Sequence, residues 1–136
     1  MGMVTPEESA GANMGNLALS VVLEEINAAD ASVGVTLSVH NSLCAAPINR
    51  FGSPEMKARY LPRMAKGEIL GAYALTEPEA GSDSANLRTR AEKKGDRWVL
   101  NGSKIWITTG DYAGVLIVFA RTDTSVSKAK GITAFV

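Results

Sequence analysis

Residues suited to chemistry gather in the loop that follows a predicted strand near residue 75. The loop, residues 77–83, contains Pro78, Gly81, Ser82 and three carboxylates. Proline fixes φ, glycine lets another group approach the backbone closely, and serine or aspartate side chains can hydrogen-bond neighbouring amides. An ordinary surface turn has the same composition, but loops at strand ends also bind ligands. Both interpretations stay open on these residues alone.

A second cluster, residues 101–110, places a tryptophan two residues before a threonine. Asn101-Gly102 is typical of a type I′ hairpin turn, and the residues after it predict a strand over 104–108. Side chains alternate along a strand, so Trp106 and Thr108 would share one face and meet the same flat ligand. A tryptophan in a strand is more often part of a core. This cluster alone is therefore a weak indication of a ligand site.

The composition excludes several classes of protein. The 136 residues balance 14 Lys and Arg against 14 Asp and Glu, so the chain lacks the basic surface that a general nucleic-acid-binding protein needs. Its single cysteine, Cys44, cannot form an intramolecular disulfide. Cys44 and the single histidine, His40, cannot supply four ligands to a structural zinc ion, so no metal site is predicted.

The apolar stretch near the N-terminus, residues 17–23, is too short to cross a membrane and is followed directly by Glu24 and Glu25. No basic residue precedes it, as a signal peptide would require. We therefore expect no membrane span. The expected location is the cytoplasm or, after processing, the matrix of an organelle.

The elements that must position the two clusters begin with helices, which fill the chain up to Gly67. Apolar residues within 14–29 recur at i, i+3, i+4 and i+7, which predicts an amphipathic helix with one buried stripe. The stripe consists of Leu19, Val22, Leu23 and Ile26.

Two further helices are predicted between residues 32 and 66. Ser32 is expected to cap the first of them, which Pro47 bends or ends. Ser53-Pro54-Glu55 is a strong start signal for the second, because serine caps a helix, proline suits its first position and glutamate favours the positive end of its dipole. Gly67 is expected to end it.

From Ile69 onward, short runs of strand-forming residues alternate with turn signals, and a meander of antiparallel strands is expected. The predicted strands are 69–76, 87–94, 97–100, 104–108, 115–121 and 132–136. The last run reaches Val136 without a turn or a polar tail, so we expect the chain to be a fragment of a longer protein.

Together, the two clusters resemble the sequence signatures of the acyl-CoA dehydrogenase family. The pattern Leu75-Thr76-Glu77-x-x-Ala80-Gly81-Ser82-Asp83 is similar to its first signature, and Asn101-Gly102-x-Lys104-x-Trp106-Ile107-Thr108 is similar to its next landmark. The chain departs from the pattern at Glu79, where the family often has glycine, and at Asn86, where the signature usually ends in a small residue. Further similar segments lie along the chain at 23–26, 40–43, 51–53, 60–62 and 130–135.

This resemblance implies an α+β fold. Residues 1–70 would be part of an N-terminal helical domain, and residues 71–136 would be part of a middle β-domain, an incomplete antiparallel β-barrel or sandwich. The family's C-terminal helical domain would be absent from this chain.

The resemblance also implies an FAD site. The residues that it assigns to the cofactor are Tyr73, Ala74, Leu75, Thr76, Gly81, Ser82, Trp106, Ile107 and Thr108. Leu75 and Thr76 would meet the isoalloxazine ring, and Gly81-Ser82 would lie at the pyrophosphate. Trp106 would lie against the ring, and Thr108 would bond near the N5 atom that receives the hydride.

The implied reaction is the α,β-dehydrogenation of an acyl-CoA thioester to a trans-2-enoyl-CoA, a step of fatty acid β-oxidation. Electrons would pass to an electron-transfer flavoprotein, and the complete enzyme would be a homotetramer. The family's catalytic glutamate lies in the C-terminal domain, so we expect the general base beyond Val136. Neither Glu77 nor Glu79 is expected to replace it, and the chain alone is expected to lack turnover.

Two residues are assigned to the substrate. Ser82 would touch the thioester, and Val39 would lie near the floor of the acyl pocket, where its small side chain favours a short or branched acyl chain. The neighbouring His40 is expected to be structural, as a single histidine among apolar helix residues usually is. Cys44 is expected to be a small buried residue without a reactive thiolate.

Two alternatives remain open. The first is another flavin chemistry on the same scaffold, an acyl-CoA oxidase or a flavin monooxygenase, which the preferred electron acceptor would separate from a dehydrogenase. The second is a non-catalytic binding or assembly module, which would bind neither FAD nor CoA.

Overall fold

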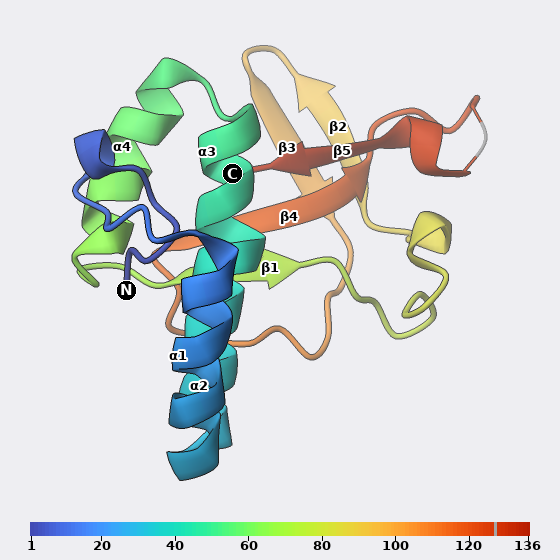
Figure 1. The fold of residues 1–136 in the computed structure, drawn as a ribbon. Coiled ribbons are helices and arrows are strands. Elements are labelled where there is room, and N and C mark those ends of the chain that lie inside the picture. The colour runs from blue at the N-terminus through green and yellow to red at the C-terminus, as the bar shows by residue number, and fades with distance from the viewer. Residues whose placement is uncertain (127) are drawn as a thin grey trace. The chain divides into compact units, whose positions relative to one another are not determined.

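The computed structural model describes residues 1–126 and 128–136 and divides into two compact units (Figure 1). The first, called here the helical unit, comprises Met1–Tyr73 and Thr108–Leu116. The second, called the β unit, comprises Ala74–Ile107 and Ile117–Val136.

Helices make up most of the helical unit. They are the 3₁₀ turn η1 (Glu7–Ser9), α1 (Gly15–Ala29), α2 (Ala31–Ser38), the π-helical segment η2 (Val39–Ala45), α3 (Ala46–Phe51) and α4 (Pro54–Ala65). Helices α1 and α2 pack against each other (Figure 1). The three predicted helices are thus confirmed, although the second is a chain of three consecutive helical segments.

Side chains that accept hydrogen bonds from the first turn mark where α2 and α4 begin. Ser53 accepts a hydrogen bond from the Met56 N–H, which confirms the predicted start of α4. The prediction that Ser32 caps the second helix is wrong, because the Asp30 carboxylate accepts from the N–H groups of Ser32 and Val33. Aspartate and serine are nearly equal caps, so the capping preference does not favour Ser32 over Asp30, which lies two residues earlier.

The π-helical segment η2 ends just before Pro47, which occupies the start of α3. Proline has no N–H to donate to the preceding turn, so regular α-helical bonding cannot continue through it. A single π-helical turn accommodates such an interruption without ending the helix. Pro47 therefore changes the winding of the helix, and Gly52 ends it.

The core of the helical unit is built from side chains of α1, α2, η2, α3 and α4, and it leaves almost no space around Cys44. The fully buried residues include Cys44, Ile48, Leu61 and Met64. A Cβ atom on Gly71 would lie 2.6 Å from the Cys44 Cβ and 2.7 Å from the Met64 Cε. Only glycine lets the start of β1 approach these side chains so closely. The expectation that Cys44 is buried is confirmed.

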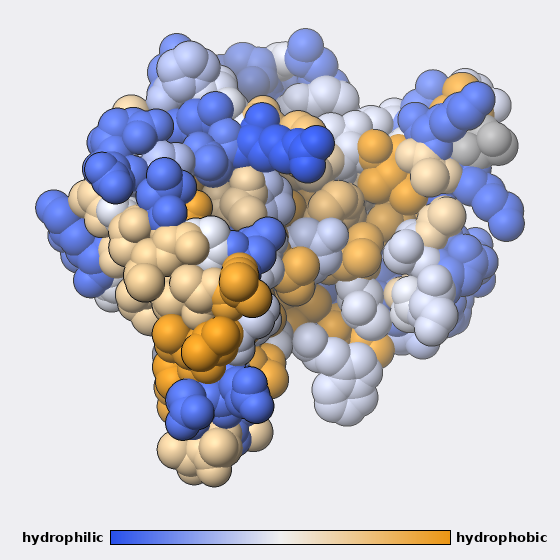
Figure 2. Space-filling model, viewed as in Figure 1, coloured by the Kyte–Doolittle hydropathy of each residue, from blue (hydrophilic) through white to orange (hydrophobic). Residues whose placement is uncertain are grey.

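One face of the helical unit is apolar and exposed. Figure 2 shows hydrophobic side chains gathered over α1 and α2. The predicted stripe is partly buried, because Leu19 is buried while Val22, Leu23 and Ile26 are half-buried. Leu17 and Val21, which lie outside the stripe, are 81% and 56% exposed. Among the described residues, no helix is both long and apolar enough to span a membrane.

The strands are β1 (Gly71–Ala74), β2 (Arg90–Lys94), β3 (Arg97–Asn101), β4 (Val115–Arg121) and β5 (Ile132–Phe135), with the 3₁₀ turns η3 (Ser84–Asn86) and η4 (Lys128–Gly131) between them. The strand order is β1-β4-β2-β3, and β5 pairs with β4. Pairs β2–β3 and β4–β5 are antiparallel, whereas β2 and β4 run parallel. The predicted α+β fold is confirmed, but the sheet is mixed rather than a simple antiparallel meander.

The structure corrects two predictions around Gly102. The hairpin turn lies at Gly95-Asp96, between β2 and β3, and no hairpin follows Asn101. Residues 104–108 form a loop instead of a strand. The reason is tertiary: a Cβ on Gly102 would lie 2.3 Å from the Thr89 hydroxyl, so this glycine serves a close packing contact and not a turn.

Candidate functional site

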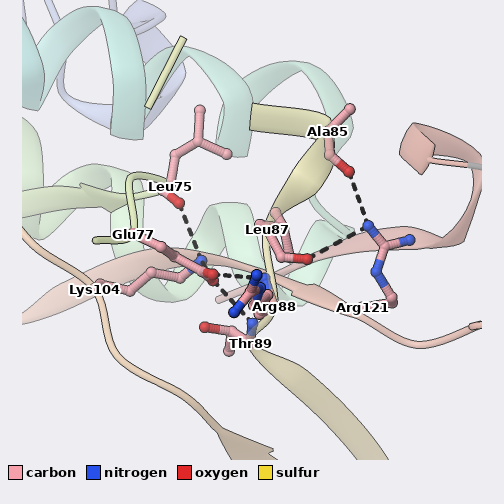
Figure 3. Close-up of polar contacts among 8 residues, drawn as sticks. All are labelled: Leu75, Glu77, Ala85, Leu87, Arg88, Thr89, Lys104 and Arg121. Atoms are coloured by element: carbon pink, nitrogen blue, oxygen red, sulfur yellow. Dashed lines mark hydrogen bonds and ion pairs between the residues drawn. The ribbon is translucent and has the colours of Figure 1, made fainter. Parts of the chain in front are cut away.

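The centre of the candidate site is the carboxylate of Glu77, which is only 5% exposed. Its Oε1 accepts from the Lys104 ammonium at 2.8 Å and from the Thr89 N–H at 2.9 Å. Its Oε2 accepts from the Arg88 N–H at 2.5 Å. Figure 3 shows these groups converging on one carboxyl group within the β unit. A buried carboxylate is tolerated because each of its oxygens has a charged or amide donor.

The ionisation of Glu77 follows from this geometry. Burial by itself raises the pKa of the carboxyl, but the bond to Lys104 and the amide N–H groups of Arg88 and Thr89 outweigh it and lower the pKa to about 2. Glu77 is therefore ionised at neutral pH and acts only as an acceptor. A general base needs a higher pKa and a free lone pair near the proton it removes. Both properties support the expectation that Glu77 is not the catalytic base.

Lys104 joins the two clusters that the sequence singled out. Its ammonium also donates to the Leu75 carbonyl at 3.0 Å. The backbone adds a parallel contact, from the Ile105 N–H to the Thr76 carbonyl at 3.0 Å. The segment 75–77 and the residues just before Trp106 are thus held in one register within the β unit. We call this arrangement the Glu77–Lys104 clamp.

Trp106 has an unusual environment. Its side chain is 87% exposed, and its backbone has a φ of 58°, in the left-handed region. The expectation that Trp106 and Thr108 share a strand face is wrong, because the loop conformation removes the alternation on which it depended. Non-glycine residues with positive φ are uncommon and mark sites where the surroundings force the conformation. Here the clamp holds the two residues before Trp106.

The remaining residues assigned to the flavin are divided between the units. In the β unit, Ala74 is buried, Leu75, Thr76 and Ile107 are half-buried, and Gly81 and Ser82 are exposed. Nothing lies within 4 Å of a Cβ built on Gly81, so the backbone there is open to an approaching group. Tyr73 and Thr108 are half-buried and belong to the helical unit.

The residues beside the assigned acyl pocket lie in the π-helical segment of the helical unit. Val39 is half-buried, and His40 is 1% exposed. The Gly71 N–H donates to His40 Nδ1 at 3.1 Å, so the proton of the neutral ring is on Nε2, which donates to the Met64 carbonyl at 3.1 Å. Burial lowers the pKa of His40 despite the raising effect of the Met64 carbonyl. The structural role expected for His40 is confirmed.

The residues present fit a flavin better than a metal ion. Within the β unit, the almost fully exposed indole of Trp106 offers a stacking surface, and the open, exposed Gly81-Ser82 backbone offers hydrogen-bond donors to a phosphate-bearing ligand. In the part of the chain that the structure describes, no group of three or more His, Cys, Asp or Glu residues could hold a metal ion.

Sequence reasoning missed the clamp. Lys104 and Glu77 are 27 positions apart, and no local pattern connects them. Arg121 was also missed. It ends β4, and its guanidinium donates to the carbonyls of Ala85 and Lys128 (Figure 3 shows the first contact). The only available signal was that both Lys104 and Glu77 belong to motifs that carry the family resemblance.

Comparison with known proteins adds independent information. Residues 1–68 match the family description "Acyl-CoA dehydrogenase, N-terminal domain", and residues 72–136 match "Acyl-CoA dehydrogenase, middle domain". The chain is 43% identical to isovaleryl-CoA dehydrogenase of Pongo abelii, over 100% of the chain and 32% of the relative. It is 47% identical to short-chain specific acyl-CoA dehydrogenase of Mus musculus, over 99% and 32%.

A solved structure agrees in fold. Glutaryl-CoA dehydrogenase from Mycobacterium smegmatis in complex with FADH2 superimposes with a TM-score of 0.90 at 38% identity, covering 99% of this chain and 33% of that one. The chain therefore spans about a third of the length of the proteins it matches.

Proposed function

The chain belongs to the acyl-CoA dehydrogenase family, and we propose that it supplies the flavin-facing part of an FAD-dependent enzyme that oxidises acyl-CoA thioesters to trans-2-enoyl-CoA. The observation that carries the proposal is the Glu77–Lys104 clamp, which holds together the two segments assigned to the cofactor. In this proposal residues 1–70 belong to the N-terminal helical domain and residues 71–136 to the middle β-domain.

FAD, when bound, supplies the acceptor for the hydride that leaves the β-carbon. The residues of this chain bind and orient it. Trp106 offers its exposed indole face to the ring, while the half-buried Leu75 and Thr76 border it. The open backbone at Gly81 and the exposed Ser82 hydroxyl would donate to the pyrophosphate, and Ser82 would also reach the thioester.

Proton removal from the α-carbon is assigned to a glutamate that this chain does not contain, beyond Val136. Glu77 holds its proton too weakly for that role, and its oxygens are already occupied. The proposed division of labour is therefore binding and orientation in this chain and base catalysis elsewhere in the enzyme.

We propose a short or branched acyl group as the substrate. Val39 is a small side chain at the assigned pocket floor, and the relatives include enzymes named for isovaleryl-CoA and for short-chain substrates. Electron-transfer flavoprotein is the proposed acceptor and a homotetramer the proposed assembly. A bacterial cytoplasm or a mitochondrial matrix is the proposed location.

The test uses the protein expressed from its complete gene. We expect it to carry FAD after purification, and its flavin absorbance to bleach when butyryl-CoA or isovaleryl-CoA is added without oxygen. Re-oxidation by electron-transfer flavoprotein rather than by oxygen would separate a dehydrogenase from an oxidase. A colourless protein that shows no bleaching after FAD is added would contradict the proposal.

The FAD affinity of two tryptophan variants tests whether Trp106 contacts the flavin. Trp106→Ala should weaken FAD binding by about fivefold, since aromatic stacking contributes about 1 kcal/mol. Trp98→Ala is the matched control, because Trp98 lies in β3 and packs on Phe135 with ring centroids 5.4 Å apart. Equal weakening by both variants would argue against the assigned role of Trp106.

A further inference from the structure

A pocket of about 430 Å³ in the β unit is lined by basic side chains. It contains Arg88, Arg90, Arg121 and Lys128, together with the Thr124 hydroxyl, and none of its lining residues is acidic. The whole chain carries equal numbers of acidic and basic residues, so this local excess of positive charge is a property of the fold and not of the composition. Concentrated positive potential in a concave surface attracts anions.

Arg121 is fixed at the wall of this pocket. Its Nη1 donates to the Lys128 carbonyl at 2.9 Å, and its Nη2 donates to the carbonyls of Ala85 at 2.8 Å and Leu87 at 3.4 Å (Figure 3 shows the Nη2 contacts). These bonds orient the guanidinium but do not neutralise its charge. They occupy three of its five N–H donors and leave two for a ligand.

Arg90 increases the excess charge beside Arg121. The two residues are register partners in the parallel pairing of β2 with β4. Like charges on directly paired positions destabilise a sheet. Within the described residues, Arg90 has no ion pair, whereas Arg88 is already paired with Glu79. A bound anion would remove the repulsion between Arg90 and Arg121.

We propose that Arg90, Arg121, Lys128 and Thr124 form a binding site for a phosphate group. Guanidinium groups match the geometry of phosphate oxygens, and a lysine and a hydroxyl add further donors. The site itself rests on the pocket. The identity of its natural ligand rests on the proposed function, under which both FAD and CoA carry a diphosphate and CoA also carries a 3′-phosphate.

Calorimetric titration of the protein expressed from its complete gene with inorganic pyrophosphate tests the site. Arg90→Gln should weaken binding at least about fivefold, because it removes one of the two paired guanidinium groups. Arg97→Gln is the matched control, since Arg97 is an exposed β-unit arginine outside the pocket and the same charge is lost. Lys128→Gln should weaken binding in the same direction. Equal affinity of the wild type and Arg90→Gln, or no binding of pyrophosphate, would overturn the proposal.

Titrations with intact nucleotides identify the source of the phosphate. Weaker binding of CoA by Arg90→Gln, with unchanged binding of 3′-dephospho-CoA, would assign the site to the 3′-phosphate. Weaker binding of FAD, with unchanged binding of riboflavin, would assign it to the flavin diphosphate. Pyrophosphate binding that depends on Arg90 in a complete protein that binds neither FAD nor CoA would uphold the site and contradict the proposed function.

Discussion

In the helical unit, the neutral ring of His40 joins the π-helical segment η2 to α4 and to β1. In the β unit, the ionised carboxylate of Glu77 joins the loop after β1 to the segment before β2 and to Lys104. Each side chain is almost fully buried, and each connects segments far apart in the sequence.

The difference between these two regions lies in charge. Hydrogen bonds to an ionised group are about twice as strong as neutral ones, but a buried charge that loses its partner is costly. A neutral imidazole is cheaper to bury, yet it gains a proton close to physiological pH. The hydrogen bonds of Glu77 in the β unit are therefore the stronger set, and losing one of its partners costs more free energy. The hydrogen bonds of His40 in the helical unit are the set that mild acid weakens.

The largest expected effect comes from Glu77→Gln. The variant leaves the Lys104 ammonium without its anion and turns an amide group towards backbone N–H donors, which should cost about 3 kcal/mol of unfolding free energy. Urea unfolding measures the loss. Glu79→Gln is the control, because Glu79 forms an exposed pair with Arg88 that should contribute less than about 1 kcal/mol. Equal losses in the two variants would remove the proposed contrast between buried and exposed carboxylates.

Gly71→Ala tests the helical unit in the same assay. Its new Cβ would lie 2.6 Å from the Cys44 Cβ, and the backbone N–H of residue 71 would be moved away from His40. Overpacking of this kind costs about 2 kcal/mol. Gly81→Ala is the matched control and should change stability little, since nothing lies within 4 Å of its Cβ. A stable Gly71→Ala protein would contradict the tight packing described around Cys44.

The stability of the two units should depend on pH in different ranges. The pKa of His40 is lower in the folded state than its ordinary value of 6.5, so the unfolded chain binds the proton first and stability falls as the pH drops below about 6.5. The slope can reach about 1.4 kcal/mol per pH unit. Glu77, whose pKa is lowered from 4.5 to about 2, loses its contribution only as the pH falls through that lower range.

Urea unfolding at pH 7.5, 6.5 and 5.5 measures this dependence. His40→Gln should abolish most of the slope, because His40 is the only histidine in the chain. A slope that survives in His40→Gln would assign the pH dependence to another group.

The smallest expected effect is at an exposed hydrogen bond. Ser53→Ala removes the side-chain acceptor for the Met56 N–H at the start of α4 and should cost about 1 kcal/mol. Ser53→Thr keeps a capping hydroxyl and should cost less. If alanine and threonine have the same effect, the cap contributes nothing measurable, and the buried connections account for more of the stability of the helical unit.

Local signals explain which elements could be predicted. Ser53, Pro54 and Gly67 mark the ends of α4, and the apolar run 115–121 coincides with β4. The strand predicted over 104–108 failed because its composition is that of a strand while its backbone has one contact, from Ile105 to Thr76, and then turns left-handed at Trp106. The parallel pairing of β2 with β4 also depends on chain segments distant in sequence, which no local pattern encodes.

The candidate site shows the same limit. The residues assigned to the flavin were found through motifs, which are local patterns in the sequence. The contacts that hold these segments were not predicted, because they join Glu77 to the N–H groups of Arg88 and Thr89 and to Lys104, which lie 11, 12 and 27 positions further along the chain. Motifs identify which residue types recur, but only the folded backbone shows which of them meet.

The burial of Cys44 makes its thiol a reporter of how often the core of the helical unit opens. Burial raises the pKa of its thiol to about 12, so the reactive thiolate is almost absent while the unit is closed. Because it is the only thiol in the chain, a reagent such as iodoacetamide can label the protein only during the moments when this core opens. The rate of labelling then reports how readily the core around Cys44 opens. It does so at a single position and without any engineered probe.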